Sequence, residues 1–238
     1  MVQIYNNTDE INIEAANLFI ESAQKAITAK GKFTAVLTGG SSPAGIYKLL
    51  ASDAYKNKIE WSKVFIFWGD ERWVPLNDDL SNAKMSYSTL LSHVPIPQEN
   101  IFEMYKDGVT PEDYAVEYEK SIRTVLGEEG TFDLILLGMG DDGHTASLFP
   151  GEAVLQEQTK WVDAYYLAPQ KMYRITLTAP LINKAEKIVV VAFGEKKINA
   201  LKEVTTGEYN PTLYPMQLIK PLSGELLFLV DKVAAGKN

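Results

Sequence analysis

The sequence predicts an α/β fold whose core is a mainly parallel, Rossmann-like sheet with helices on both faces. Segments with the apolar character of buried strands alternate along the chain with segments that repeat apolar residues at helical spacing. The strand segments are apolar throughout, which is typical of parallel strands that are covered on both faces. No internal repeat, low-complexity segment or linker interrupts this order, so we expect residues 1–238 to form a single domain.

The expected elements have recognisable boundaries. Gly31 is placed to cap the C-terminus of the first helix, while Ser42 and Pro43 suit the N-cap and the first position of the second. Thr110 and Pro111 open the fourth helix in the same way. Helices are expected over residues 9–30, 43–50, 81–92, 110–127 and 195–204, and strands over residues 33–38, 64–68, 132–138, 161–166, 174–178, 187–193 and 226–230.

Composition and charge exclude several kinds of function. The chain has no cysteine, which rules out disulfides, thiolate nucleophiles and cysteine-ligated zinc. Its net charge of −8 comes with no basic stripe, so nucleic acid is not an expected partner. The N-terminus lacks a signal-peptide pattern, and no apolar run approaches the roughly 20 residues that cross a bilayer. We therefore expect a cytoplasmic protein without membrane contact, whose oligomeric state stays open.

The segment Phe132–His144 is the most informative part of the chain. An apolar run of strand character ends in a glycine-rich, acidic turn, and this turn leads to His144. Because ligands bind beyond the carboxyl ends of parallel strands, a histidine there is placed for proton transfer near neutral pH. A turn whose imidazole only caps a carbonyl group is the other interpretation. His93, the second histidine, is expected at a helix C-terminus and receives no catalytic role.

A second glycine-rich turn, Thr38–Pro43, joins an expected strand to an expected helix. The backbone N–H groups of Gly39, Gly40, Ser41 and Ser42 could bind a single phosphate or carboxylate. The turn lacks the lysine and the length of a P-loop, so a nucleoside triphosphate is not indicated. A tight, well-capped turn without a ligand fits the same residues.

The turn after residue 137 also matches the GxGxxG pattern of dinucleotide sites, but we reject NAD as a cofactor. Pro150 and Gly151 prevent the sustained helix that such a site needs. Asp141 and Asp142 would in addition place like charge against a pyrophosphate. No cofactor is therefore expected.

The carboxylates of the chain raise a metal site as an alternative. Asp70, Glu71, Asp141 and Asp142 are ligands of the kind that hard cations such as magnesium prefer. No histidine spacing typical of zinc sites is present. Because Asp141 and Asp142 also suit a tight turn and the orientation of His144, no metal is expected.

Charged residues at other expected strand ends complete the candidate site. Asp70 and Arg72 follow a strand that we expect to be central in the sheet. At its carboxyl end, Asp70 could orient His144 or a ligand hydroxyl, and Arg72 could bind an oxyanion or a phosphate. Arg174 begins an expected strand, and Lys197 lies in the first turn of an expected helix. A lysine there is either solvated or reaches an anion held at the same end of the sheet, because the helix dipole disfavours a cation.

Six segments, in order and spanning almost the whole chain, resemble the 6-phosphogluconolactonases, within the wider group that includes glucosamine-6-phosphate isomerase/deaminase. They are LTGGSSPAGIYKLL (37–50), WGDERWVPLNDDLSN (68–82), FDLILLGMGDDGHTASLFPG (132–151), RITLTAPLIN (174–183), FGEKKINAL (193–201) and GELLFLVDKVAA (224–235). The resemblance implies a Rossmann-like parallel sheet without a dinucleotide. It also implies hydrolysis of a small sugar-phosphate lactone, 6-phosphoglucono-1,5-lactone, in the pentose phosphate pathway without a metal.

The resemblance also implies roles for individual residues. His144 takes the place of the family's general base, while the loop over residues 38–42, Arg174 and Lys197 correspond to phosphate-binding positions. Asp70 and Arg72 match the family's acidic–arginine motif. We therefore expect a catalytic set of His144, Asp70, Arg72 and Asp142 and a phosphate-binding set of Gly39, Gly40, Ser41, Ser42, Arg174 and Lys197.

Two other functions stay open. The deaminase branch of the wider group has a glutamate five residues after the histidine, for ring opening and proton transfer, where this chain has Phe149. That branch also typically has DEY where this chain has Asp70-Glu71-Arg72, and both differences favour the lactonase. A non-enzymatic sugar-phosphate sensor would need the phosphate loop but not His144 as a base.

Overall fold

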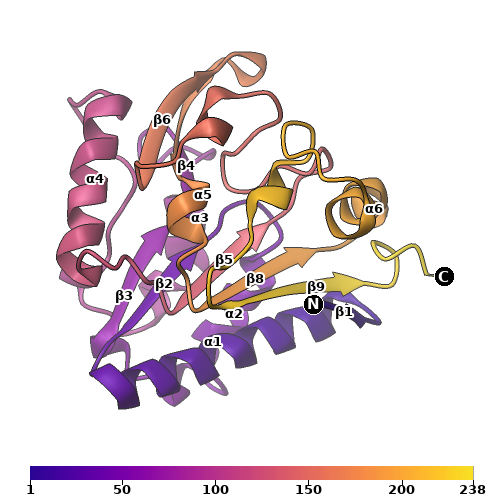
Figure 1. The fold of residues 1–238 in the computed structure, drawn as a ribbon. Coiled ribbons are helices and arrows are strands. Elements are labelled where there is room, and N and C mark those ends of the chain that lie inside the picture. The colour runs from indigo at the N-terminus through magenta and orange to yellow at the C-terminus, as the bar shows by residue number, and fades with distance from the viewer. Residues whose placement is uncertain (238) are drawn as a thin grey trace.

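The computed structural model describes residues 1–237 and has a six-stranded sheet. This sheet lies at the centre of the molecule (Figure 1). Its strand order is β1-β9-β8-β5-β2-β3, and every pairing is parallel. The strands are β1 (Val2–Tyr5), β2 (Phe33–Leu37), β3 (Val64–Trp68), β5 (Leu134–Gly138), β8 (Lys187–Ala192) and β9 (Glu225–Asp231). The prediction of an α/β fold with a mainly parallel sheet is confirmed, although β1, which is short and exposed at alternate residues, was not predicted.

Helices lie on both faces of this sheet. With right-handed crossovers, the strand order places α1 (Thr8–Lys30) and α2 (Ala44–Ala51) on one face. It places α4 (Pro111–Leu126), α5 (Ala179–Ile182) and α6 (Ile198–Thr206) on the other. Figure 1 shows α1 along the lower side of the sheet and α5 and α6 above it. α3 (Asn82–Thr89) packs against α2.

The strand order reverses between two central neighbours, β2 and β5. The chain runs outward from β2 to β3, and in the opposite direction from β5 through β8 to β9. The segments that follow β2 and β5 therefore leave toward opposite faces, which opens a crevice at the carboxyl ends of these two strands. The loops at this crevice are the glycine–serine turn and the turn that leads to His144.

A second, three-stranded antiparallel sheet lies at the carboxyl end of β3. Its order is β4 (Asp70–Arg72), β7 (Met172–Leu177) and β6 (Val162–Leu167). β4 follows β3 after one residue, Gly69, whose N–H donates to the Leu37 carbonyl. The expected strands 161–166 and 174–178 thus do not join the parallel sheet, because β6 and β7 form a hairpin that adds to β4 instead. β3 itself is an edge strand rather than the central strand that we expected before Asp70.

Most predicted helix ends are close to the observed ones. Gly31 caps α1 with a φ of 76°, and Thr110 accepts a hydrogen bond from the Asp113 N–H at the start of α4. The predictions of Ser42 as the N-cap and Pro43 as the first helical residue are wrong, because Pro43 is the N-cap of α2 and no side chain caps this helix. The expected helices 81–92 and 195–204 each include a 3₁₀ turn, over Leu91–His93 and Glu195–Lys197.

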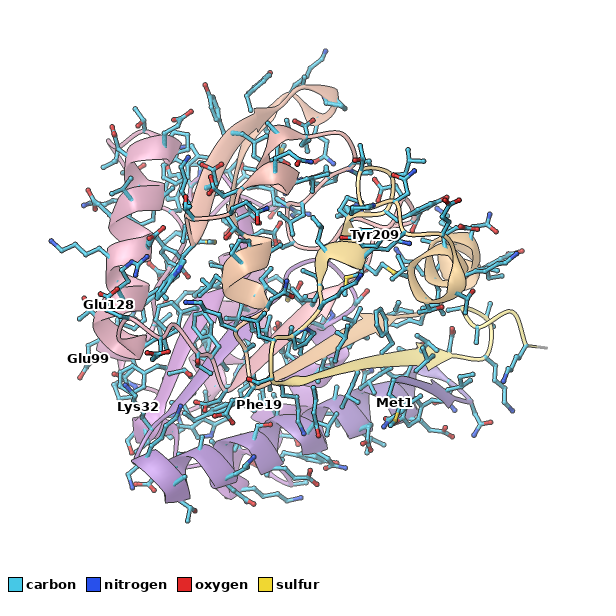
Figure 2. All side chains as sticks on the ribbon, viewed as in Figure 1. Met1, Phe19, Lys32, Glu99, Glu128 and Tyr209 are labelled. Atoms are coloured by element: carbon cyan, nitrogen blue, oxygen red, sulfur yellow. The ribbon has the colours of Figure 1, made fainter. Side chains whose placement is uncertain are left out.

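The core lies between the helices and the parallel sheet. Every residue of β2 is buried, and Phe19 of α1 meets Phe33 of β2 edge to face at 5.1 Å between ring centroids. Figure 2 shows Phe19 between α1 and the sheet, whereas Glu128 lies at the outer surface. Within residues 1–237, none of the helices has the length and apolar character that spanning a membrane requires.

Candidate active site

A pocket of about 300 Å³ opens at the crevice between the carboxyl ends of β2 and β5. Every residue predicted for the site lines this pocket except Asp142, whose side chain is hydrogen-bonded to His144. The lining comes from the loops after β2, β5 and β8, from β4 and β7, from the β6–β7 turn and from the start of α3. It comprises Thr38, Gly39, Gly40, Ser41, Ser42, Asp70, Arg72, Asn82, Gly138, Met139, Gly140, His144, Ala146, Phe149, Gln170, Arg174 and Lys197.

His144 is held by Asp142. The Nδ1 atom of His144 lies 2.6 Å from Oδ1 of Asp142, and the His144 backbone N–H donates to the same oxygen at 3.1 Å. Burial acts to raise the pKa of Asp142, but the hydrogen bonds and charge of His144 outweigh it and hold the pKa below its ordinary value. Because an ionised carboxylate only accepts, Nδ1 carries the proton and Nε2 of the neutral imidazole is left as the basic nitrogen.

The surroundings of the imidazole restrict its position. A Cβ on Gly140 would lie 2.1 Å from Nδ1 of His144, so only glycine fits at this turn. On the other side the Phe149 ring stacks on the imidazole, with 4.1 Å between centroids and an interplanar angle of 26°. Phe149 is itself buried and lines the pocket, so it shields one face of His144 from water.

Two arginines stand side by side on the pocket wall. Arg72 of β4 is the direct cross-strand partner of Arg174 of β7, an arrangement that places like charges opposite each other. The Nε atoms of both are buried, and neither has a hydrogen-bond partner among residues 1–237. Burial lowers the pKa of Arg174, while the nearby Asp70 acts to raise it. Two unsatisfied guanidinium donors in one wall are suited to holding an anion.

The loop after β2 adds neutral donors to this wall. In the described chain, the main-chain N–H groups of Gly39, Gly40, Ser41 and Ser42 form no hydrogen bond with protein acceptors. A Cβ on Gly39 would lie 1.8 Å from Oδ1 of Asn82, so glycine is required where the loop meets α3. Free N–H groups that lead into a helix N-terminus attract negatively charged ligands.

Lys197 reaches the pocket from the loop after β8. It ends the 3₁₀ turn before α6, and its Nζ lies 2.5 Å from Oδ1 of Asp141. Its position on the pocket favours the interpretation of Lys197 as a lysine at an anion site over that of a solvated side chain. It adds a third cationic group to those of Arg72 and Arg174.

Asp70 does not orient His144, which corrects one of the two roles considered for it. Its Oδ2 atom accepts a hydrogen bond from Ser147 Oγ at 2.7 Å and lies 3.8 Å from Nη1 of Arg174. The reason is that Asp70 belongs to β4, whose neighbour is β7 rather than β5. The Asp142 carboxylate has the orienting position instead.

Three pocket residues were not singled out from the sequence. Asn82 begins α3 and donates from Nδ2 to the Asp70 carbonyl at 2.9 Å, while Gln170, in the β6–β7 turn, accepts from Arg174. Ala146 has a φ of 47°, a left-handed conformation that is uncommon for a residue with a side chain. Asn82 could have been found as a polar residue in the first turn of a helix, but neither of the other two carries a local signal.

No group of three or more histidine, cysteine or acidic side chains that could hold a metal ion occurs within residues 1–237. The carboxylates that raised this alternative are separated: Asp70 faces Arg174, Asp141 contacts Lys197 and Asp142 contacts His144.

Comparisons with known proteins agree with the fold and place the chain in a family. Residues 6–228 match the family described as glucosamine-6-phosphate isomerases/6-phosphogluconolactonase. The chain is 40% identical over 218 residues to a 6-phosphogluconolactonase of Synechocystis sp., covering 90% of this chain and 88% of that protein. It is 37% identical to a probable 6-phosphogluconolactonase of Arabidopsis thaliana, covering 99% and 92%.

A solved structure extends this likeness to three dimensions. The crystal structure of 6-phosphogluconolactonase from Thermotoga maritima superposes with a TM-score of 0.83 at 28% sequence identity, covering 98% of this chain and 99% of that one. The resemblance noted in the sequence motifs is thereby confirmed at the level of the family. The chain belongs to the glucosamine-6-phosphate isomerase/6-phosphogluconolactonase family.

Proposed function

We propose that this protein is a 6-phosphogluconolactonase, which hydrolyses 6-phosphoglucono-1,5-lactone to 6-phosphogluconate. The observation that carries the proposal is one pocket in which a basic histidine nitrogen lies among anion-binding groups. These groups are the free N–H donors of residues 39–42, the Arg72–Arg174 pair and Lys197. The names of the relatives from Synechocystis and Arabidopsis support the same reaction.

In the proposed reaction, His144 is the general base. Nε2 takes a proton from a water molecule as the water oxygen attacks the lactone carbonyl carbon, and the imidazolium then returns a proton to the ring oxygen as the ring opens. Asp142 stabilises the imidazolium and holds the tautomer that leaves Nε2 free. A lactone is already an activated ester, so this route needs no covalent nucleophile, metal or cofactor.

The cationic side of the pocket binds the phosphate and places the sugar. Arg174, Lys197 and the N–H groups of residues 39–42 hold the phosphate, which fixes the distant carbonyl carbon beside His144. Arg72, beside Arg174, stabilises negative charge that develops on the carbonyl oxygen. Asp70 accepts a hydrogen bond from a sugar hydroxyl through the carboxylate that Ser147 orients.

The sugar-phosphate deaminase is the second candidate, because the family includes both activities. Phe149 argues against it, since this ring stacks on His144 where ring opening of an amino sugar would require a carboxylic acid. Replacing Phe149 by glutamate should not create a good deaminase, because the charged group would enter a site shaped for an apolar ring.

A cytoplasmic location and a single domain stay predictions from the sequence.

Acid release from freshly prepared 6-phosphogluconolactone, corrected for spontaneous hydrolysis, tests the proposal. We expect enzyme-dependent release from the lactone and no comparable release of ammonia from glucosamine 6-phosphate. Ammonia release at a similar rate would favour the deaminase. Binding of the sugar phosphate without any turnover would favour the sensor.

A further inference from the structure

Glu71 is a fully buried carboxylate for which the proposed mechanism has no use. It lies on β4 between Asp70 and Arg72, with none of its surface exposed. Because successive side chains of a strand point to opposite faces, Glu71 points away from the face that carries Asp70 and Arg72. Among residues 1–237, no cationic side chain forms an ion pair with it.

Four hydrogen-bond donors surround this carboxylate. Oε1 accepts from the backbone N–H groups of Arg72 and Asn82, both at 2.8 Å. Oε2 accepts from the Ala83 N–H at 2.9 Å and from Ser81 Oγ at 3.1 Å. The donors belong to β4 and to the cap and first turn of α3, where a negative charge is favoured by the free N–H groups and the helix dipole.

The segments that Glu71 joins carry pocket residues. The chain between them, residues 73–80, forms no helix or strand. Arg72 donates from Nη1 to the Leu80 carbonyl at 2.7 Å, and Asn82 donates from Nδ2 to the Asp70 carbonyl at 2.9 Å. Both contacts join β4 to the segment at the start of α3, which are the same two parts of the chain that the Glu71 hydrogen bonds join.

This carboxylate is held at a cost in stability. Burial raises the pKa of Glu71 to about 7, although three backbone N–H groups act to lower it. A protonated Glu71 would have to turn an O–H toward a site where each oxygen already faces two donors. The ionised form therefore matches the surrounding donors, while burial disfavours it. An arrangement of this kind is better explained by what it positions than by what it stabilises.

We propose that Glu71 is a positioning residue, whose carboxylate holds Arg72 and Asn82 at the pocket by tying β4 to the first turn of α3. Glu71 touches no substrate and acts through these two residues. Its effect on turnover rests on the proposed function, in which Arg72 contacts the substrate, whereas its effect on the local structure does not.

The kinetic test is a double-mutant cycle of Glu71→Gln with Arg72→Ala. Glutamine keeps the size of the side chain but places an NH₂ group against donors that need an acceptor. We expect Glu71→Gln to lower kcat/KM for the lactone by about tenfold in the wild-type background, and by clearly less once Arg72 is alanine, because only the effect through Asn82 then remains. Wild-type kcat/KM in the single variant, or equal losses in both backgrounds, would overturn the proposal.

Asp133→Asn provides the matched control. Asp133 is also a buried carboxylate that accepts from a backbone N–H and a hydroxyl, both of Thr34, but it lies at the amino end of β5. This variant should lose stability without changing kcat/KM. A loss of kcat/KM equal to that of Glu71→Gln would show that the effect is a general result of a disturbed interior.

A structural measurement separates this proposal from the proposed function. Amide hydrogen exchange at Arg72, Asn82 and Ala83 should become faster in Glu71→Gln while the exchange of β2 stays unchanged. If the wild-type protein does not hydrolyse the lactone, the proposed function fails, but faster exchange still supports the anchoring. If exchange at these amides is unchanged, the Glu71 proposal fails whatever the activity. Should Glu71→Gln not fold, Glu71→Asp, which keeps the charge and withdraws it by one methylene, takes its place.

Discussion

The two ends of the parallel sheet differ in how their polar groups are satisfied. At the amino end, a hollow of about 510 Å³ lies between α1 and the starts of β5, β8 and β9. Its buried carboxylate, Asp133, is 2.7 Å from Lys30 Nζ and accepts from the Thr34 N–H and hydroxyl. At the carboxyl end, the smaller pocket of about 300 Å³ has two buried guanidinium nitrogens and a run of backbone N–H groups without protein partners.

This contrast shows that volume alone does not identify a ligand site. The larger hollow is lined by charged side chains that are exposed to solvent, such as Glu21 and Lys25, or paired with one another, such as Lys187 and Glu225. In the smaller pocket, the buried Nε atoms of Arg72 and Arg174 have no hydrogen-bond partner within residues 1–237. These two arginines also place like charges opposite each other. Unsatisfied buried donors are uncommon in folded proteins, so they favour the carboxyl end of the sheet as the ligand site proposed above.

The largest effect should come from removing the proposed base. We expect His144→Ala to lower kcat by about 10²-fold or more, a typical loss for a general base, with the fold retained. Acid release from the lactone is the measurement, and circular dichroism checks the fold. His93→Ala is the matched control, because His93 is exposed and its side chain, within residues 1–237, hydrogen-bonds only with the Ser88 carbonyl, at 3.0 Å. Near-normal turnover by a folded His144→Ala protein would contradict the assignment.

A weaker form of the same experiment uses Asp142→Asn. The amide can donate toward Nδ1, which favours the tautomer with the proton on Nε2 and removes the base. We expect kcat to fall by less than in His144→Ala, and the two changes together to cost little more than His144→Ala alone. Additive losses would mean that Asp142 acts independently of the histidine.

Replacing a cationic side chain should weaken substrate binding only at the carboxyl end of the sheet. Arg174→Ala and Lys197→Ala should each weaken binding of the phosphorylated substrate by about one to two decades, because a charge-assisted contact is worth roughly 1.5–3 kcal/mol. Lys25→Ala, at the larger hollow, should leave KM unchanged. The measurement compares phosphorylated and plain lactone, and variants that discriminate between them as well as the wild type does would contradict the phosphate assignment.

A smaller effect should appear in the pH dependence of stability. Because the pKa of Glu71 is raised to about 7 in the folded protein, its contribution to the free energy of unfolding is present below its ordinary pKa of 4.5 and lost as pH rises through 7. Between pH 6 and 8 this loss should be about 1 kcal/mol in the wild type and absent in Glu71→Gln. Urea unfolding of both proteins at the two pH values measures it, and parallel curves would show that Glu71 does not titrate there.

No effect is expected from metal removal. In the proposed chemistry, His144 transfers the protons, while the arginines and Lys197 stabilise negative charge. Turnover should therefore not change with EDTA or with added magnesium. A loss of lactone hydrolysis with EDTA that magnesium restores would revive the carboxylate metal site and demote the histidine mechanism.

The sequence by itself determined the parallel sheet and the loops that form the pocket. Apolar runs over β2, β5 and β8 alternate with helical segments, and a sheet of this kind brings the carboxyl ends of its strands to one edge. The glycine–serine turn after β2, His144 after β5 and Lys197 after β8 therefore share a site. These inferences succeeded because the periodicity of side chains and the backbone preferences of glycine and proline are local properties of the chain.

Only the tertiary structure decided which distant segments meet. The β6–β7 hairpin adds to β4 rather than to the parallel sheet, and this pairing sets Arg72 opposite Arg174 and brings Asp70 near Arg174. Glu71 and Asn82 gain their places through the contact of β4 with α3. Strand pairing and packing between segments far apart in the chain decide these contacts. The local sequence around each residue therefore does not predict them.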